Sequence, residues 1–205
     1  RLGLCLHVGT QTTDPAAYKR AIKVASKVIA ASTVTVDVLD VGGGFPVQYP
    51  GQAIPPFADY VDTIKAAMKS EKLNLPLMCE PGRALVATGG SLVVRVEGRK
   101  GDLLYINDGT YGGLFDAGAS VKGRFEVRCI APDGMVRDSA NLQAFRFAGP
   151  TCCSIDMMKG PFMLPANIQA GDWIEIQTMG AYSYGMRSNF NGFGHADMIL
   201  MQPGA

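Results

Sequence analysis

The first half of the chain alternates between short apolar runs and longer segments in which apolar and polar positions recur at helical spacing. The apolar runs are rich in β-branched residues, which favour strands. The amphipathic segments each begin near a proline, which is tolerated in the first turn of a helix. The order strand, helix, strand, helix, strand predicts a parallel sheet. We expect strands at residues 4–8, 34–41 and 75–80 and helices at residues 15–29 and 56–68.

The pattern changes after about Arg83. From Ser91 onward, short apolar runs are separated by turns rich in Gly, Pro, Asp and Asn, and helical periodicity is missing. This pattern predicts a mostly antiparallel β domain. We expect its strands at Leu92–Glu97, Leu103–Ile106, Phe125–Ile130, Leu142–Phe147, Trp173–Gln177 and Met198–Met201.

Composition narrows the class of protein. Of 205 residues, 47% are hydrophobic and 18% are charged, and the formal net charge is +1. This balance is typical of a globular protein and calls for neither a nucleic acid nor a membrane as partner. No apolar run approaches the roughly 18 residues of a membrane-spanning helix. The chain begins at Arg1 without features of a secretion signal, so we interpret it as a fragment of a longer protein.

The cysteines indicate a reducing compartment. Their number, five, is odd, and Cys5, Cys79 and Cys129 lie inside apolar runs, as free buried thiols do. The adjacent Cys152 and Cys153 have no second pair at zinc spacing, and the two histidines are not spaced as ligands. We therefore expect a cytoplasmic protein without a structural metal.

Three of the predicted strands end in residues that can carry chemistry. His7 follows the first apolar run, residues 42–44 form a glycine triplet after the second, and residues 80–83 (Glu-Pro-Gly-Arg) follow the third. Parallel barrels and open parallel sheets bind ligands at the carboxyl ends of their strands. We therefore expect these residues to line one pocket, which suits a phosphorylated cofactor that contains a ring.

Each motif also has an ordinary explanation. A histidine at a strand end is often a hydrogen-bonded core residue, a glycine triplet can be a flexible turn, and Glu80 with Arg83 can be a simple salt bridge. Glycines directly after a strand also let backbone N–H groups approach a phosphate closely. In the functional interpretation, Arg83 binds the phosphate and Glu80 keeps a pyridine nitrogen protonated.

Four loops of the second half combine glycines with polar, aromatic or thiol side chains. Their composition alone indicates turns. The thiols of Cys152 and Cys153 are either packed as small apolar groups or, if the pKa is tuned, serve as a proton donor or nucleophile. The loops are residues 107–113, 149–156, 179–182 and 189–193.

In this order, the segments resemble the fold-type III pyridoxal-phosphate-dependent basic amino acid decarboxylases, most closely the ornithine decarboxylases. The resemblance runs from residue 1 to about residue 203. It implies an α/β plus all-β fold, in which the C-terminal part of a (β/α)8 barrel precedes an alanine-racemase-like β domain. Residues 1–88 would be the last three β/α units of the barrel, and residues 89–205 the β domain with the Cys152 loop. It also implies a head-to-tail homodimer with shared active sites.

The same resemblance implies roles for single residues. His7 would stack on the cofactor ring and Glu80 would pair with its nitrogen. Cys152 would reach across the dimer to protonate the α carbon of the substrate after CO2 leaves. The remaining cofactor contacts would include the phosphate, and no metal is implied. The full cofactor set is His7, Thr10, Gly42, Gly43, Gly44, Glu80, Pro81, Gly82, Arg83 and Tyr182.

The substrate end of the site departs from the family pattern. Phe115 and Asp116 fall near the aromatic–Asp pair that receives the distal amine of the substrate from the partner subunit. The residue after Cys152 is Asp in ornithine decarboxylases but Cys153 here. A neutral thiol cannot replace a charge-assisted hydrogen bond of about 1.5–3 kcal/mol. The Schiff-base lysine of the family lies in an early barrel strand that has no counterpart in this chain, so the fragment alone is expected to be inactive.

The implied activity is decarboxylation of L-ornithine to putrescine, in polyamine biosynthesis. Lysine, arginine and diaminopimelate remain alternative substrates, and Gln11 is the one feature that leans toward diaminopimelate. A non-catalytic binding protein like the antizyme inhibitors is the alternative from another functional class. A barrel lyase for a phosphorylated sugar would explain the glycines and Arg83, but neither the β domain nor Cys152.

Overall fold

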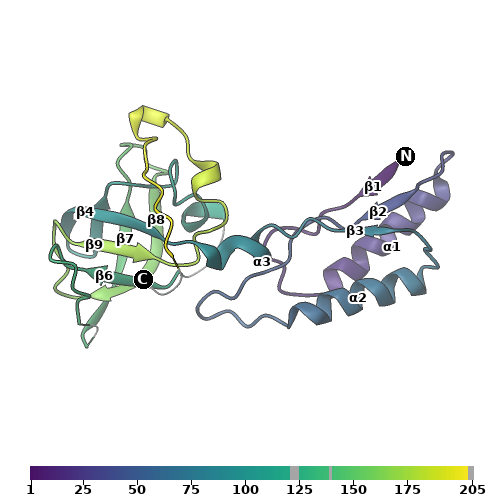
Figure 1. Cartoon of the computed structure of the whole chain (residues 1–205), viewed down its shortest axis with the longest axis horizontal. Coiled ribbons are helices and arrows are strands. Elements are labelled where there is room, and N and C mark those ends of the chain that lie inside the picture. Colours follow the sequence, from purple (N-terminus) through teal and green to yellow (C-terminus); the bar gives the residue numbers. More distant parts are fainter. Residues whose placement is uncertain (121–124, 139, 203–205) are drawn as a thin grey trace. The chain divides into compact units, whose positions relative to one another are not determined.

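The chain folds into two compact units, Arg1–Gly89 and Gly90–Ala205. The computed structural model describes residues 1–120, 125–138 and 140–202 (Figure 1). Each unit has its own sheet: three strands in the first unit and six in the second. The first unit is α/β and the second is mostly β, as the sequence predicts.

The first unit alternates strands and helices. Its strands pair in parallel in the order β1-β2-β3, which confirms the predicted parallel sheet. None of the helices that the structure describes has both the length and the apolar character needed to cross a membrane. The elements are β1 (Gly3–Cys5), α1 (Ala16–Ala31), β2 (Val38–Asp40), α2 (Phe57–Ser70), β3 (Leu77–Met78), α3 (Arg83–Val86) and η1 (Ala87–Gly89).

The core of the first unit lies between the sheet and its two long helices. Tyr18 and Ile22 of α1, Tyr60 and Ile64 of α2 and Leu39 of β2 are each at most 3% exposed. Both helices cover the same side of the sheet (Figure 1). Each helix and strand buries one apolar face in this core. The polar residues at the strand ends lie on the sheet face that the helices do not cover.

The second unit is a six-stranded sheet in the order β6-β9-β4-β5-β7-β8. Every neighbouring pair is antiparallel except β5 and β7, which confirms a mostly antiparallel β domain. Its strands are β4 (Leu92–Lys100), β5 (Leu103–Ile106), β6 (Val127–Ile130), β7 (Leu142–Ala148), β8 (Met157–Pro165) and β9 (Trp173–Ile176). Its short helical turns are η2 (Asp116–Ser120), η3 (Tyr184–Met186) and η4 (Phe190–Gly192).

Two predictions for this unit are wrong. The expected strand at Met198–Met201 is absent, and these side chains are 72–91% exposed. An apolar run is not enough for a strand, because its backbone groups also need a neighbouring strand. Conversely, β8 was not predicted, because Gly160 and Pro161 interrupt its apolar pattern as a turn would.

Several expected strands are longer or shorter than the observed ones. The predicted strand at residues 34–41 shrinks to β2, and residues 75–80 shrink to β3. Hydrogen bonds between neighbouring segments nevertheless continue past the strand ends. The N–H of Val41 donates to Met78 O at 2.9 Å, and the N–H of Glu80 donates to Gly42 O at 2.8 Å. The loops that carry the candidate site are therefore anchored to one another.

Candidate active site

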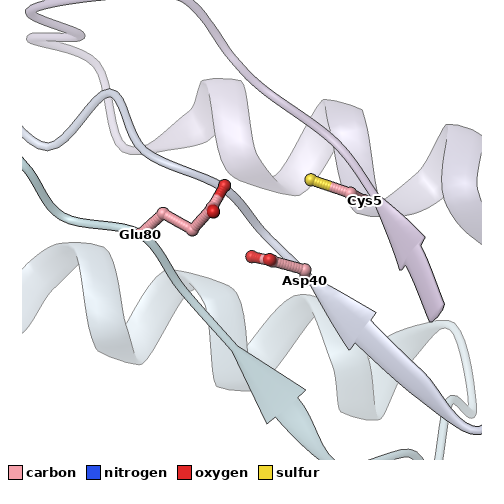
Figure 2. Close-up of side chains that lie close together, drawn as sticks. All are labelled: Cys5, Asp40 and Glu80. Atoms are coloured by element: carbon pink, nitrogen blue, oxygen red, sulfur yellow. The ribbon is translucent and has the colours of Figure 1, made fainter.

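Three polar side chains meet on the sheet face opposite the helices of the first unit. Cys5 ends β1, Asp40 ends β2 in register with Cys5, and Glu80 follows β3 (Figure 2). One ligand atom from each residue lies within 4.8 Å of those of the other two. We call Cys5, Asp40 and Glu80 the carboxylate cluster. It brings negative charge to one point at the carboxyl ends of parallel strands.

The carboxylate cluster is built to attract a positively charged or hydrogen-bond-donating group. Desolvation and the nearby carboxylates of Asp40 and Glu80 raise the pKa of the Cys5 thiol. Asp40 is held in place because its Oδ1 accepts the N–H of Gly42 at 2.8 Å. The same three residues are also a candidate ligand set for a metal ion. Sequence spacing did not indicate this set, because its members come from three separate strands.

A second cluster surrounds Arg83, the first residue of α3. Arg83 is 4% exposed; its Nη1 donates to Tyr49 Oη at 2.7 Å and its Nη2 to Thr10 Oγ1 at 3.3 Å. We call Thr10, Tyr49 and Arg83 the anion cluster. A buried guanidinium beside two hydroxyl groups offers the donors that a phosphate group accepts. Sequence reasoning missed Tyr49; its position soon after the glycine triplet was the only indication.

The glycine triplet connects the two clusters. A Cβ on Gly43 would lie 2.8 Å from Glu80 O and 3.4 Å from His7 Cε1. A Cβ on Gly44, whose φ is +99°, would lie only 2.3 Å from Gly9 O. These glycines are required because neighbouring loops pack directly against them. His7 and Glu80 pack against Gly43, and the loop that carries Thr10 packs against Gly44.

Tyrosine hydroxyls from the two long helices support the same loops. Tyr18 Oη donates to Gly43 O at 2.8 Å, and Tyr60 Oη donates to Thr12 O at 2.9 Å. Burial raises the pKa of both hydroxyls, so both stay protonated donors at neutral pH. The helix core therefore sets the position of the glycine triplet and of the loop after Thr10.

The sequence-predicted residues of the first unit thus lie close together. His7, Thr10 and Glu80 are exposed, Arg83 is buried, and Gly82 directly precedes α3. Pro81 is partly buried beside Glu80. The two clusters differ in chemistry: one offers donors to an anion, and the other offers acceptors to a protonated nitrogen. This pair of environments fits pyridoxal phosphate, which carries a phosphate at one end and a pyridine nitrogen in its ring.

A different set of residues organises residues 149–156 of the second unit around Asp156. We call this segment, which carries Cys152 and Cys153, the thiol loop. The Asp156 side chain accepts the N–H and hydroxyl of Thr110 at 2.7 and 3.0 Å, and those of Thr151 at 3.2 and 2.6 Å. Asp156 is 1% exposed, and a Cβ on Gly109 or Gly149 would lie within 2.3 Å of its carboxylate. One buried carboxylate therefore holds two loops in a fixed relation.

The two adjacent thiols lie on this fixed loop. Cys152 is exposed and has a left-handed φ of +59°, a conformation that costs an ordinary residue about 1–2 kcal/mol. Cys153 is partly exposed, with its Sγ 3.4 Å from Tyr111 Oη. The hydrogen bond with Tyr111, followed by one from the backbone of Ile155, lowers the pKa of the Cys153 thiol. Backbone strain kept at a reactive side chain is typical of a functional site.

A third loop completes this surface. The ring of Phe190 stacks on that of Tyr111 with centroids 4.3 Å apart, and Asn191 Nδ2 donates to Thr151 O at 2.8 Å. Ser188 donates to Tyr111 O through its N–H and its hydroxyl. The loops of residues 107–113, 149–156 and 189–193 are therefore one assembly. Asp156 and Tyr111, which connect these loops, were not identified from sequence spacing.

The other predicted residues of the second unit, Phe115, Asp116 and Tyr182, are distant from the two thiols in the sequence. Asp116 begins η2 and is 3% exposed, and Phe115 beside it is partly exposed. Tyr182 is 44% exposed and has a left-handed φ of +52°. The expected roles of Tyr182 at the phosphate and of Asp116 at the substrate stay predictions.

Comparison with known proteins assigns the first unit to a family. Residues 2–87 match the family model described as the pyridoxal binding domain of pyridoxal-dependent decarboxylases. An ornithine decarboxylase of Schizosaccharomyces pombe is 32% identical in an alignment of 220 positions, which covers 98% of this chain and 48% of that protein. Antizyme inhibitor 2 of Xenopus laevis is 30% identical in an alignment of 230 positions, which covers 100% of this chain and 48% of that protein.

Solved structures resemble the chain over both units. The lysine/ornithine decarboxylase of Vibrio vulnificus, crystallised with putrescine, superposes with a TM-score of 0.73 at 31% identity. The match covers 95% of this chain and 53% of that structure. The chain therefore spans about half the length of the proteins that it matches.

Proposed function

We propose that this chain, which belongs to the fold-type III pyridoxal-phosphate-dependent decarboxylases, is the C-terminal half of an enzyme that removes the α-carboxyl group of a basic amino acid. L-Ornithine is the first candidate for the substrate, with putrescine as the product. The complete protein would act as a cytoplasmic homodimer. We propose further that an upstream segment supplies the lysine to which the cofactor is attached.

One observation carries the proposal more than any other. The buried Arg83 belongs to a cluster of hydrogen-bond donors and the exposed Glu80 to a cluster of acceptors. The glycine triplet packs against the backbone of Glu80 at Gly43 and against that of Gly9, next to Thr10, at Gly44. A phosphate would bind to the guanidinium of Arg83 and the hydroxyl of Thr10. The ring nitrogen would face the carboxylate of Glu80, with His7 against the face of the ring.

Catalysis depends on charge at the ring nitrogen. Bound pyridoxal phosphate supplies an electron sink whose capacity is largest when its ring nitrogen is protonated. Glu80 would hold that proton, because a carboxylate stabilises a neighbouring N–H⁺ group. Asp40 adds negative charge at the same point and is fixed by the N–H of Gly42.

The thiol loop would supply the acid. Cys152 is exposed, and its loop is fixed by the four hydrogen bonds to Asp156. A proton donor must be held within hydrogen-bond reach of its target, which a rigid loop achieves. We propose that Cys152 of one subunit returns a proton to the substrate α carbon in the site of the other.

Substrate choice would depend on Cys153, Phe115 and Asp116. A carboxylate at position 153 could pair with a distal ammonium group, whereas a neutral thiol with its sulfur beside Tyr111 Oη cannot do so as strongly. The distal amine would then rely on Asp116 and on the aromatic ring of Phe115. The absence of a carboxylate at position 153 would weaken the discrimination between ornithine and lysine. Arginine and diaminopimelate are further alternative substrates.

A non-catalytic role is the second candidate, and two observations favour it. The chain is 30% identical to an antizyme inhibitor, and Cys153 replaces the expected carboxylate. In that case the protein would bind a regulatory partner and need no cofactor. The presence of His7, Glu80, Arg83 and Cys152 favours the enzyme.

The test is a substrate panel with the full-length protein. Purified protein with added pyridoxal phosphate is incubated with ornithine, lysine, arginine and diaminopimelate, and CO2 and the amine product are measured. We expect CO2 release to be faster from ornithine or lysine than from arginine or diaminopimelate. No release from any of the four, together with no cofactor absorbance band, would leave the non-catalytic role.

A further inference from the structure

We propose that Cys152 and Cys153 form an oxidant-sensitive dithiol: a hydroperoxide oxidises Cys153, and Cys152 then closes a reversible disulfide with it. The site lies entirely in the second unit, in the loop that Asp156 holds. Only the effect of this disulfide on catalysis rests on the proposed function, because the disulfide would consume the thiol that we assign as proton donor. The two thiols themselves are adjacent whatever the enzyme does.

The surroundings of Cys153 favour a reactive thiol. Its Sγ lies 3.4 Å from Tyr111 Oη, and its side chain is partly exposed. The N–H of Asp156 donates to Cys153 O at 2.9 Å, which fixes the turn after the thiol. Tyr111 is fixed in turn by the ring of Phe190. A small hydroperoxide could therefore reach a sulfur that is held in one environment.

The electrostatics of Cys153, Cys129 and Cys5 support this choice. Hydrogen bonds from Tyr111 and the backbone of Ile155 lower the pKa of Cys153, which increases its thiolate fraction at neutral pH. Burial raises the pKa of Cys129 to about 11, and desolvation with nearby carboxylates raises that of Cys5. Cys129 and Cys5 are therefore less reactive than Cys153.

Cys152 is placed to complete the reaction. It is exposed, it adjoins Cys153 in the chain, and its φ of +59° departs from the conformations that strands and helices use. Adjacent Cα atoms are about 3.8 Å apart across a trans peptide, closer than in most disulfides. A bond between the two sulfurs would therefore be strained and easily reduced, as in labile regulatory disulfides.

The chemistry balances in two steps. The Cys153 thiolate attacks one oxygen of hydrogen peroxide; the O–O bond breaks, and hydroxide leaves and takes up a proton as water. The product is a sulfenic acid, in which sulfur has lost two electrons. The Cys152 thiolate then attacks that sulfur; the S–O bond breaks and a second water leaves. Two thiols and one peroxide thus give one disulfide and two waters, and a thiol reductant reverses the reaction.

The test is peptide mass spectrometry of the full-length protein. Trypsin should release residues 147–159, which contain Cys152 and Cys153 alone, and residues 73–83, which contain Cys79 alone. After hydrogen peroxide and then alkylation, we expect peptide 147–159 to lose two hydrogens and remain unalkylated at both thiols. Dithiothreitol should restore double alkylation. Peptide 73–83 should stay alkylated as the internal control.

Two variants and one further readout make the result decisive. Cys152→Ser should leave Cys153 as a sulfenic acid, and Tyr111→Phe should slow alkylation of Cys153 several-fold at pH 7.5 while keeping the ring on Phe190. Alkylation of both thiols in the wild type to the same extent as Cys79 after peroxide would overturn the proposal, as would unchanged Cys153 reactivity in Tyr111→Phe. Peptide mass spectrometry does not depend on catalytic activity, so this result stands even if the proposed function fails. Loss of CO2 release that dithiothreitol restores tests the link to catalysis separately.

Discussion

The Arg83 guanidinium donates a 2.7 Å hydrogen bond to Tyr49 Oη, although the two residues are 34 positions apart in the chain. Tyr49 is 1% exposed and Arg83 is 4% exposed, so the pair holds a cationic group in place beside Thr10. A buried cationic group that is preorganised by its hydrogen bonds needs little rearrangement to bind an anion.

Replacing Arg83 should weaken cofactor binding. Arg83→Met removes charge-assisted hydrogen bonds of about 1.5–3 kcal/mol, so we expect pyridoxal phosphate to bind about ten- to a hundredfold more weakly. Fluorescence titration of the full-length apoprotein measures this. Arg20→Met is the matched control, because Arg20 is exposed and forms an ion pair with the exposed Asp14 near the start of α1. Equal affinities of the two variants would contradict the role of Arg83.

The close approach at Gly44 should make it far less replaceable than a glycine with similar backbone strain. Gly51 also has a left-handed φ, +75°, but a Cβ there meets nothing within 4 Å. Gly51→Ala should cost about 1–2 kcal/mol of unfolding free energy from the backbone alone. Gly44→Ala should cost several times more, because its Cβ would collide with Gly9 O. Urea unfolding of both variants measures the difference, and equal losses would show that the packing at Gly44 is not as described.

Asp156 should be needed for the thiol loop. Each carboxylate oxygen of Asp156 accepts the N–H and the hydroxyl of one threonine, Thr110 or Thr151. Asp156→Asn converts one of these oxygens into a donor and leaves the backbone N–H of that threonine without an acceptor in a buried site. We expect a loss of about 2–4 kcal/mol of stability and slower CO2 release. Asp133→Asn is the control, because Asp133 is exposed and accepts the N–H of Met135. A variant at Asp156 as stable as that control would contradict this role.

Restoring a carboxylate at position 153 should sharpen substrate choice. Cys153→Asp would offer the distal ammonium of ornithine an ion pair, which lowers the KM for ornithine about tenfold or more if a bond of about 1.5–3 kcal/mol is regained. Cys153→Asn has nearly the same shape without the charge and should give little of this effect. Steady-state rates with ornithine and lysine decide the matter. An unchanged KM in Cys153→Asp would place the distal amine elsewhere.

The sequence predicted the elements more reliably than the contacts between them. Helical spacing from Tyr18 and from Phe57 gave α1 and α2, because one face of each helix is buried. The strand ends at His7 and Glu80 were predicted to meet, because the carboxyl ends of parallel strands share one edge of a sheet. Local patterns were sufficient here, because each helix and each strand end is identified within one element and the parallel topology then brings the strand ends together.

Contacts that depend on distant residues were not predictable in this way. Tyr49 contacts Arg83 and Asp156 contacts Thr110 only because loops far apart in the chain meet, and neither pair has a characteristic spacing. The run at Met198–Met201 failed as a strand for the same reason, since pairing requires a partner strand.

The most direct test of the central claim compares CO2 release from L-ornithine by the full-length wild type and by Glu80→Gln, both saturated with pyridoxal phosphate. Gln keeps the size of the side chain but cannot stabilise a protonated ring nitrogen. We predict measurable release by the wild type and a decrease of roughly a hundredfold or more in Glu80→Gln, with the fold unchanged. Equal rates of release by the two proteins would contradict the assignment of Glu80 and the cofactor site built around it.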